Sequence, residues 1–144
     1  KFEDKNVAVC GPVIMHSSGN MEDSPRKFPT LKRLLKRRIF NGNQIDYSFK
    51  DKSITVDWIG GMFMMFPRYM FKDLNGFNEE FFMYMEDAEI CREAYQHNLK
   101  IIFDPNFSVI HLGQRKNRKE IKYLFYHIKS LFIFLFKKRK KSLI

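Results

Sequence analysis

Two adjacent carboxylates, Glu86 and Asp87, follow an aromatic-rich segment at residues 81–85. Apolar residues then recur at the spacing of a helix, at Ile90, Cys91, Ala94 and Tyr95. One turn earlier, the same stripe contains Asp87, so its carboxylate is predicted to face inward at the start of a helix. A carboxylate in that position is costly unless something uses or satisfies it. The pair is therefore either a chemical site or a cap that complements the helix dipole.

Two other places carry residue types that suit a ligand. Asp57 and Trp58 precede the pair Gly60-Gly61, and a glycine pair allows close backbone approach to a ligand while an indole presents a flat apolar face. The alternative is that Trp58 is a core residue beside a tight turn. His111 ends a predicted strand at 107–111, where a histidine is more often a satisfied core residue than a ligand.

Short strands and helices are predicted to position these residues. Strands are expected at 6–15 with a turn at Gly11-Pro12, and at 53–56, 62–66, 99–103 and 107–111, the last two separated by Asp104-Pro105. Three helices are expected. The first covers 31–39 and is ended by Asn41-Gly42-Asn43. The second has Pro67 as its first helical residue and stops at Asn75-Gly76, and the third follows Asp87. Residues 16–29 are predicted to form an irregular loop. This mixture predicts an α/β fold, with α+β as the alternative.

The formal net charge of +10 is unevenly distributed. Residues 1–114 contain 15 basic and 15 acidic side chains, whereas residues 115–144 contain 11 basic side chains and only Glu120 as an acid. The sequence therefore predicts a neutral domain at 1–114 and a basic tail at 115–144. The two cysteines, Cys10 and Cys91, lie in apolar contexts, which favours a reducing compartment over a disulfide framework.

The tail has the apolar spacing of an amphipathic helix followed by the basic run 137–141. Its apolar positions are Ile121, Leu124, Phe125, Ile128, Phe132, Leu135 and Phe136. The apolar run 131–136 is much shorter than the about 20 residues that span a bilayer. The tail is predicted either to lie on an anionic membrane or to pack on the domain with a solvated basic end.

Five short motifs follow one another in a recognisable order. They are Asp57-Trp58 with Gly60-Gly61, Asn75-Gly76-Phe77-Asn78-Glu79, Phe81-Phe82-Met83-Tyr84-Met85-Glu86-Asp87, Asp104-Pro105, and Val109-Ile110-His111-Leu112-Gly113. The series resembles the C-terminal half of the catalytic domain of family 2 glycosyltransferases, in particular the rhamnosyltransferase-like branch that builds bacterial surface polysaccharides. The likeness covers residues 7–113, and the motifs are specific only in combination.

The resemblance implies an inverting glycosyltransferase with a GT-A fold. In such an enzyme a base takes the proton of the acceptor hydroxyl, and a divalent cation neutralises the leaving diphosphate. By the same resemblance, Asp87 is the base and Glu86 supports it. The expected substrate contacts are Asp57, Trp58, Gly60, Gly61 and Tyr84, and His111 is the expected ligand of Mn²⁺ or Mg²⁺.

Several residues depart from the family pattern. Asn75 and Asn78 replace a glycine and an aspartate, Gln114 replaces a second glycine, and Arg92 stands one place before the usual arginine. An Asp-x-Asp and a nucleotide-binding βαβ unit, which the family carries upstream, are missing from this sequence. Because the sequence begins at Lys1, without an initiator Met or an apolar signal segment, we expect a piece of a longer polypeptide. Alone it should be inactive.

The expected partners are a nucleotide diphosphate sugar, with rhamnose as the candidate sugar, a lipid-linked or polysaccharide acceptor and an anionic membrane surface. This predicts a cytoplasmic protein, peripheral on the inner face of the cell membrane. One alternative is a nucleic-acid-binding module, suggested by the basic residues of 32–38 and of the tail, although the first 114 residues are neutral and contain no nucleic-acid-binding signature. The other alternative is a non-enzymatic membrane-associated module in which Glu86 and Asp87 only cap a helix.

Overall fold

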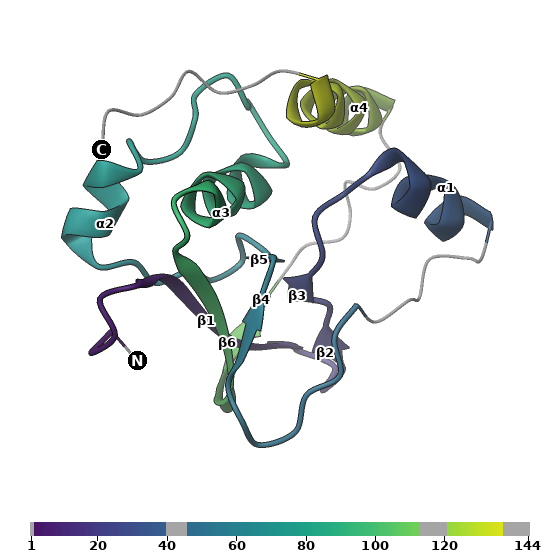
Figure 1. Ribbon diagram of the computed structural model, residues 1–144. Helices are drawn as coiled ribbons and strands as arrows, with labels where there is room; N and C mark the ends of the chain where they lie inside the picture. The colour runs from purple at the N-terminus through teal and green to yellow at the C-terminus, as the bar shows by residue number, and fades with distance from the viewer. Residues whose placement is uncertain (1, 40–45, 113–120, 137–144) are drawn as a thin grey trace.

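The computed structural model describes residues 2–39, 46–112 and 121–136 of the 144-residue chain. A four-stranded mixed sheet in the order β2-β1-β6-β4 forms its base (Figure 1). The central strands β1 (Val7–His16) and β6 (Lys100–His111) pair in parallel, so their carboxyl ends meet at one edge. The outer strands β2 (Met21–Glu22) and β4 (Ile54–Val56) pair antiparallel with β1 and β6 respectively.

A second, two-stranded sheet pairs β3 (Pro25–Arg26) antiparallel with β5 (Trp58–Ile59). Its strands come from segments 32 residues apart, and Arg26 pairs with Trp58. This small sheet joins the segment after β2 to the glycine pair at 60–61, because Gly60 N–H also donates to Ser24 O at 3.0 Å.

Four helices complete the described fold. They are α1 (Leu31–Ile39), α2 (Arg68–Asp73), α3 (Glu86–Gln96) and α4 (Ile121–Phe136). Helix α3 lies between the sheet and α4 (Figure 1). It buries Ala88, Ile90, Cys91 and Ala94 against the core that Val9, Ile59 and Phe103 form. The mixed helices and strands confirm the predicted α/β class at the level of its elements.

Three predicted helices are present at their expected positions. Helix α1 coincides with 31–39, and Asn41-Gly42-Asn43 lies outside the described residues. Helix α2 begins at Arg68, one residue after Pro67, and the chain turns left-handed at Asn75 and Gly76, with φ of 56° and 60°, as a helix stop requires. Helix α3 begins at Glu86.

Several strand predictions were wrong. Residues 99–103 and 107–111 belong to the single strand β6, because the pairing with β1 shifts register between Pro12 and Val13 and lets Pro105 sit in the irregularity. For the same reason Gly11-Pro12 makes no turn and stays inside β1. The predicted strand at 62–66 forms only one bridge, between Met65 and Cys10.

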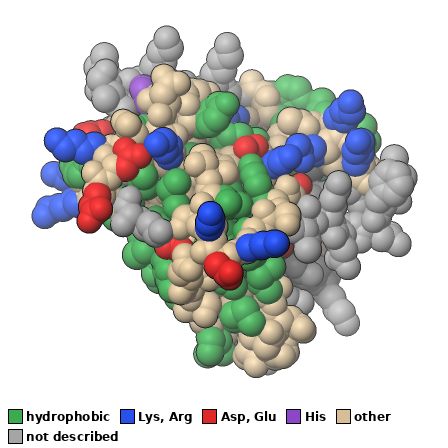
Figure 2. All heavy atoms as spheres, turned by 60° about the horizontal axis from the view of Figure 1, so that its bottom comes forward, with side chains coloured by type: hydrophobic (Ala, Val, Ile, Leu, Met, Phe, Trp, Pro, Cys, Tyr) green, Lys and Arg blue, Asp and Glu red, His purple; other side chains and the backbone are tan. Residues whose placement is uncertain are grey.

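The predicted loop at 16–29 is also more ordered than expected, since it contains β2 and β3. On helix α3 the predicted inward stripe is wrong at Tyr95, whose side chain is 62% exposed. The helix instead buries Glu89 and Glu93 in addition to its apolar residues. On the face shown in Figure 2, acidic, basic and apolar side chains are interspersed, which agrees with the cancelling charges of residues 1–114.

Candidate active site

Asp87 is held at the first turn of α3 by two backbone donors. Gly61 N–H donates to its Oδ2 at 2.7 Å, and Ala88 N–H donates to its Oδ1 at 2.8 Å. Burial raises the pKa of Asp87, and these two hydrogen bonds and the nearby positive charge of Arg26 only partly oppose that rise. The carboxylate is therefore oriented by the backbone and is more basic than an exposed aspartate.

The turn into α3 is strained where it delivers this carboxylate. Tyr84 and Met85 both have a φ of 69°, in the left-handed region that non-glycine residues rarely adopt. Residues held in such a conformation cost about 1–3 kcal/mol each and persist only where the surroundings enforce them. Met85 is the N-cap residue and makes no side-chain cap, so Asp87 does not act as the N-cap. The acidic first turn, Glu86, Asp87 and Glu89, still lies at the positive end of the helix dipole.

Glu86 adjoins Asp87 and is half-buried. Burial raises the pKa of Glu86, and the neighbouring negative charge of Asp87 raises it further. Within the described residues, its Oε2 atom is buried without a hydrogen-bond partner. A carboxyl group in this state is suited to keeping a proton or accepting a hydrogen bond from a ligand.

Arg26 lies near Asp87 and His127 lies against Tyr84, and neither residue was predicted from the sequence. The guanidinium of Arg26 lies 5.1 Å from the centroid of the Trp58 ring, and its charge lowers the pKa of both Asp87 and His127. Burial is the larger cause of the lowered pKa of His127, and it favours the neutral imidazole near pH 7. Its ring meets the ring of Tyr84 edge-on, with centroids 5.0 Å apart. Arg26 had no motif to mark it, and His127 lies in the tail.

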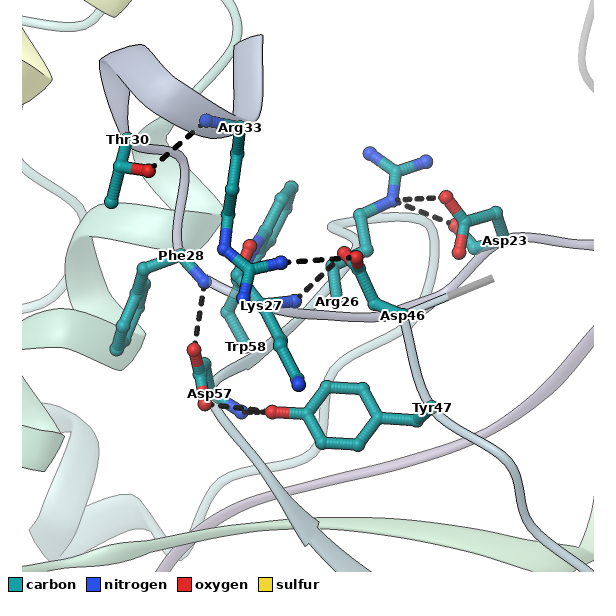
Figure 3. Close-up of polar contacts among 10 residues, drawn as sticks. All are labelled: Asp23, Arg26, Lys27, Phe28, Thr30, Arg33, Asp46, Tyr47, Asp57 and Trp58. Atoms are coloured by element: carbon teal, nitrogen blue, oxygen red, sulfur yellow. Dashed lines mark hydrogen bonds and ion pairs between the residues drawn. The ribbon is translucent and has the colours of Figure 1, made fainter. Parts of the chain in front are cut away.

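The structure places Trp58 in the core. Its side chain is only 4% exposed, and its Nε1–H donates to Lys27 O at 3.1 Å. Arg26 covers one face of the ring (Figure 3). This matches the alternative of a core residue beside a turn, and contact of Trp58 with a ligand stays a prediction that requires Arg26 to move.

Asp57 forms hydrogen bonds with two separate segments of the chain, at Phe28 and at Tyr47. Its Oδ2 accepts a hydrogen bond from Phe28 N–H at 2.9 Å, and its Oδ1 accepts one from Tyr47 Oη–H at 2.7 Å (Figure 3). The Asp57 N–H donates back to Tyr47 Oη at 2.9 Å. Burial raises the pKa of Tyr47, so the phenol stays protonated. A hollow of about 350 Å³ lies beside Asp57, lined also by Val56 and Tyr95.

Asp46 forms a second hydrogen bond to the segment that contains Phe28, at the neighbouring Lys27. Its Oδ2 accepts a hydrogen bond from Lys27 N–H at 3.0 Å, and its Oδ1 lies 3.4 Å from Arg33 Nη1 (Figure 3). Asp46 and Asp57 together fix residues 27 and 28, and through them the neighbouring Arg26. The aspartate expected to bind substrate thus supports the position of a charged residue near Asp87.

Gly61 lies directly beside the carboxylate of Asp87, whereas the N–H of Gly60 donates to Ser24 O. A Cβ atom added at Gly61 would lie 3.3 Å from Asp87 Oδ2, which is tighter than most real contacts. Gly61 therefore lets the backbone approach the carboxylate closely. Tyr84 is 36% exposed and lies in the turn before α3. The structure thus places Gly61 against Asp87, while Tyr84 and Glu86 are near Asp87 in the sequence; the roles of all four stay predictions.

His111 ends β6 at the carboxyl edge of the sheet, next to Glu22 of β2. Its Nδ1 lies 3.6 Å from Glu22 Oε1 and has no hydrogen bond within the described residues. No group of three or more metal-ligating side chains occurs in the part of the chain that the structure describes. The contacts of His111 do not link it to Asp87, and its role as a metal ligand stays a prediction.

Two bacterial proteins align with most of this chain. The rhamnosyltransferase WbbL of Escherichia coli K12 is 32% identical over 119 residues, which are 81% of this chain and 45% of that protein. The N-acetylglucosaminyl-diphospho-decaprenol L-rhamnosyltransferase of Mycobacterium tuberculosis, matched in two strains, is 26% identical over 139 residues, 90% of this chain and 45% of that protein. This chain is related to bacterial rhamnosyltransferases.

The relationship confirms the rhamnosyltransferase-like resemblance that the motifs predicted. The chain spans about half the length of the curated relatives that it matches. A search against family models found no match. In the described part of this rhamnosyltransferase relative, no helix has the length and apolar character needed to cross a bilayer.

Proposed function

We propose that this chain forms the acceptor-side, catalytic half of an inverting glycosyltransferase of the GT-A fold. The enzyme transfers a sugar, with rhamnose as the first candidate, from a nucleotide diphosphate donor to a glycan or lipid-linked acceptor. The observation that carries the proposal is Asp87, a partly buried carboxylate of raised pKa that the Gly61 backbone holds at the start of α3. The names of both relatives support the choice of rhamnose, and the mycobacterial name supports a lipid-linked acceptor.

In the proposed reaction Asp87 acts as the general base. The acceptor hydroxyl oxygen forms a bond to the anomeric carbon while the bond from that carbon to the diphosphate oxygen breaks. The hydroxyl proton passes to Asp87, and the nucleoside diphosphate leaves with the bonding electron pair. Because the attack comes from the face opposite the leaving group, the anomeric configuration inverts. General-base catalysis of this kind contributes about 10²–10⁴-fold.

Neighbouring groups of the chain prepare Asp87 for this role. The Gly61 and Ala88 N–H groups fix the carboxylate, which leaves little freedom to lose when the acceptor binds. Arg26 opposes the rise of the Asp87 pKa that burial causes, which favours the ionised form that a base requires. Glu86, with its unpartnered Oε2, is placed to accept a hydrogen bond from an acceptor hydroxyl.

His111 and Glu22 are suited to a divalent cation as part of a larger ligand set. An imidazole nitrogen without a hydrogen bond and a carboxylate 3.6 Å away are ligands that Mn²⁺ accepts, and Mg²⁺ accepts the carboxylate. Two side chains do not complete a site, so the remaining ligands would come from residues outside this chain and from the diphosphate. When bound, the cation would neutralise the charge of the leaving diphosphate.

The test is a transfer assay with the complete protein that carries this chain. A panel of labelled nucleotide diphosphate sugars is offered with an N-acetylglucosaminyl-diphospho-polyprenol acceptor, the acceptor type named for the mycobacterial relative. We expect transfer of rhamnose with inversion, read from the anomeric coupling of the product. A retained configuration would refute the role of Asp87 as base. A complete lack of transfer from every donor would refute the proposed glycosyltransferase activity.

A further inference from the structure

The outward face of α4 is a continuous apolar stripe. Six of its side chains are 57–84% exposed: Ile121, Leu124, Phe125, Ile128, Phe132 and Phe136. At about 100° per residue they fall within a sector of about 120° on the helix surface. They are six of the seven positions of the predicted stripe, and the structure turns them away from the protein. The seventh, Leu135, is half-buried and packs against the core.

The opposite face of α4 fastens the helix to the domain. Phe134 is 3% exposed in the core, and Ser130 Oγ–H donates to Met83 O at 2.6 Å. The guanidinium of Arg92 donates to Phe134 O and lies 3.9 Å from the centroid of the Phe134 ring. Because Ser130 and Phe134 occupy the anchored face, rotation of α4 cannot bury the exposed stripe. Something outside the described residues must cover it or receive it.

The charges around the stripe identify the kind of partner. Helix α4 contains Lys122 and Lys129 and no acidic residue, and both lysines border the stripe on one side. In the sequence it lies between the basic segments 115–119 and 137–141. An apolar helix face bordered by lysines is typical of helices that lie in the interface of an anionic membrane.

A second copy of the chain fits this surface less well. Basic residues flank α4 at both ends of the sequence segment. Two stripes packed face to face would therefore bring basic segments together in either a parallel or an antiparallel arrangement. Like charges at such an interface repel, whereas the anionic headgroups of a membrane would neutralise them.

We propose that the stripe of α4 docks on an anionic phospholipid membrane and thereby holds the candidate active site at the lipid surface. The anchored face of α4 also contacts the loop that leads into α3. Phe82 packs on Tyr126 with ring centroids 5.1 Å apart, Met83 O accepts the Ser130 hydrogen bond, and Tyr84 meets His127. Residues 82–84 are thus held by α4, which lies beside the loop that leads into α3 (Figure 1).

Docking places Asp87 where a lipid-linked acceptor would present its hydroxyl, and this part of the inference rests on the proposed function. The docking surface itself rests only on the contacts and exposures of α4. Vesicle binding and sugar transfer are therefore measured separately. Binding without transfer would retract the proposed function and leave the surface in place.

The experiment is co-sedimentation of the complete protein with phosphatidylglycerol-rich vesicles and with pure phosphatidylcholine vesicles. The test variant combines Ile128→Gln and Phe132→Gln, both exposed, so the fold should survive. The matched control is Ile110→Gln on β6, an apolar side chain that is 72% exposed away from α4. Circular dichroism checks that all three proteins are folded.

We expect binding to phosphatidylglycerol vesicles that weakens as salt rises from about 0.1 M to about 1 M. The double variant should bind at least about tenfold more weakly, and Ile110→Gln should bind like the unaltered protein. Equal binding to both vesicle types, or equal binding by the double variant and the control, would overturn the proposal. So would a dimer in vesicle-free solution that the double variant abolishes, since the second copy would then be the partner.

Discussion

The Gly61 N–H group and the Asp87 carboxylate, 26 positions apart in the sequence, are joined by a hydrogen bond of 2.7 Å. The bond connects the loop after β5 to the first turn of α3. Gly61 has no side chain, so the backbone reaches Oδ2 without obstruction. This single contact links the glycine-pair motif to the carboxylate-pair motif, and it fixes the direction in which Asp87 presents its other oxygen.

Replacing Asp87 with asparagine should remove activity while the protein still folds. In the complete protein, Asp87→Asn should lower kcat by about 10²–10⁴-fold and leave donor binding almost unchanged, because the base acts on the acceptor proton. The Asn Oδ1 can still accept the Gly61 hydrogen bond, but its Nδ2 then faces the Ala88 N–H, so one of the two backbone hydrogen bonds is lost. Kinetics and donor titration provide the measurement, and a variant that keeps more than about a tenth of turnover would show that Asp87 is not the base.

The same substitution has a stability consequence whose sign follows from the pKa. The pKa of Asp87 in the folded state is raised by burial, so the folded protein holds its proton to higher pH than the unfolded chain, whose aspartates titrate near about 3.9. Stability therefore falls as pH rises through these two pKa values. The urea midpoint of the unaltered protein should therefore decrease as pH rises from acid to neutral, and Asp87→Asn, which has no titrating group at this position, should show a smaller decrease.

Arg26 should set the acidic limb of the pH profile. Its charge lowers the pKa of Asp87, so Arg26→Gln should move the acidic limb of kcat/KM to higher pH. Arg26→Lys keeps the charge and should leave the limb nearer its original position. Arg68→Gln, an exposed change at the start of α2, is the control. An unmoved limb in Arg26→Gln would show that Arg26 does not act on the base.

Tyr47 should contribute to stability through Asp57. Tyr47→Phe removes the Oη that donates to Asp57 Oδ1 and accepts from Asp57 N–H. Two part-buried hydrogen bonds are lost, so we expect a loss of about 1–3 kcal/mol in the free energy of unfolding, measured in urea. Tyr69→Phe, whose side chain is 51% exposed, is the matched control. An equal effect of both changes would mean that Asp57 is not fastened by Tyr47.

His111 should contribute to the affinity of the enzyme for its divalent metal ion. If it is a ligand, His111→Ala should raise the Mn²⁺ or Mg²⁺ concentration needed for half-maximal transfer by at least about tenfold. His97→Ala, a change of the histidine that follows α3, controls for loss of an imidazole elsewhere. Identical metal dependence of His111→Ala and the unaltered protein would exclude the ligand role and leave His111 as the partner of Glu22.

The sequence by itself determined the local elements whose signals lie within a few residues. The start of α3 at Glu86, the helix stop at Asn75-Gly76 and the helix α1 followed from spacing, glycine and capping rules. The order of the motifs was enough to identify the relationship to rhamnosyltransferases. These features could be predicted because each depends on neighbours in the chain.

Only the tertiary structure decided which groups meet across long separations. Arg26 reaches the surroundings of Asp87 because β3 pairs with β5, and His127 reaches Tyr84 because α4 packs on the loop before α3. The burial of Trp58 and the single strand β6 likewise depend on partners far away in the sequence. For α4 the spacing showed an apolar stripe but not its direction. The packing of Ser130 and Phe134 on the domain determines which face of α4 is buried. The sequence could not show this, because α4 has apolar residues on more than one face and the shape of the domain surface selects the face that packs.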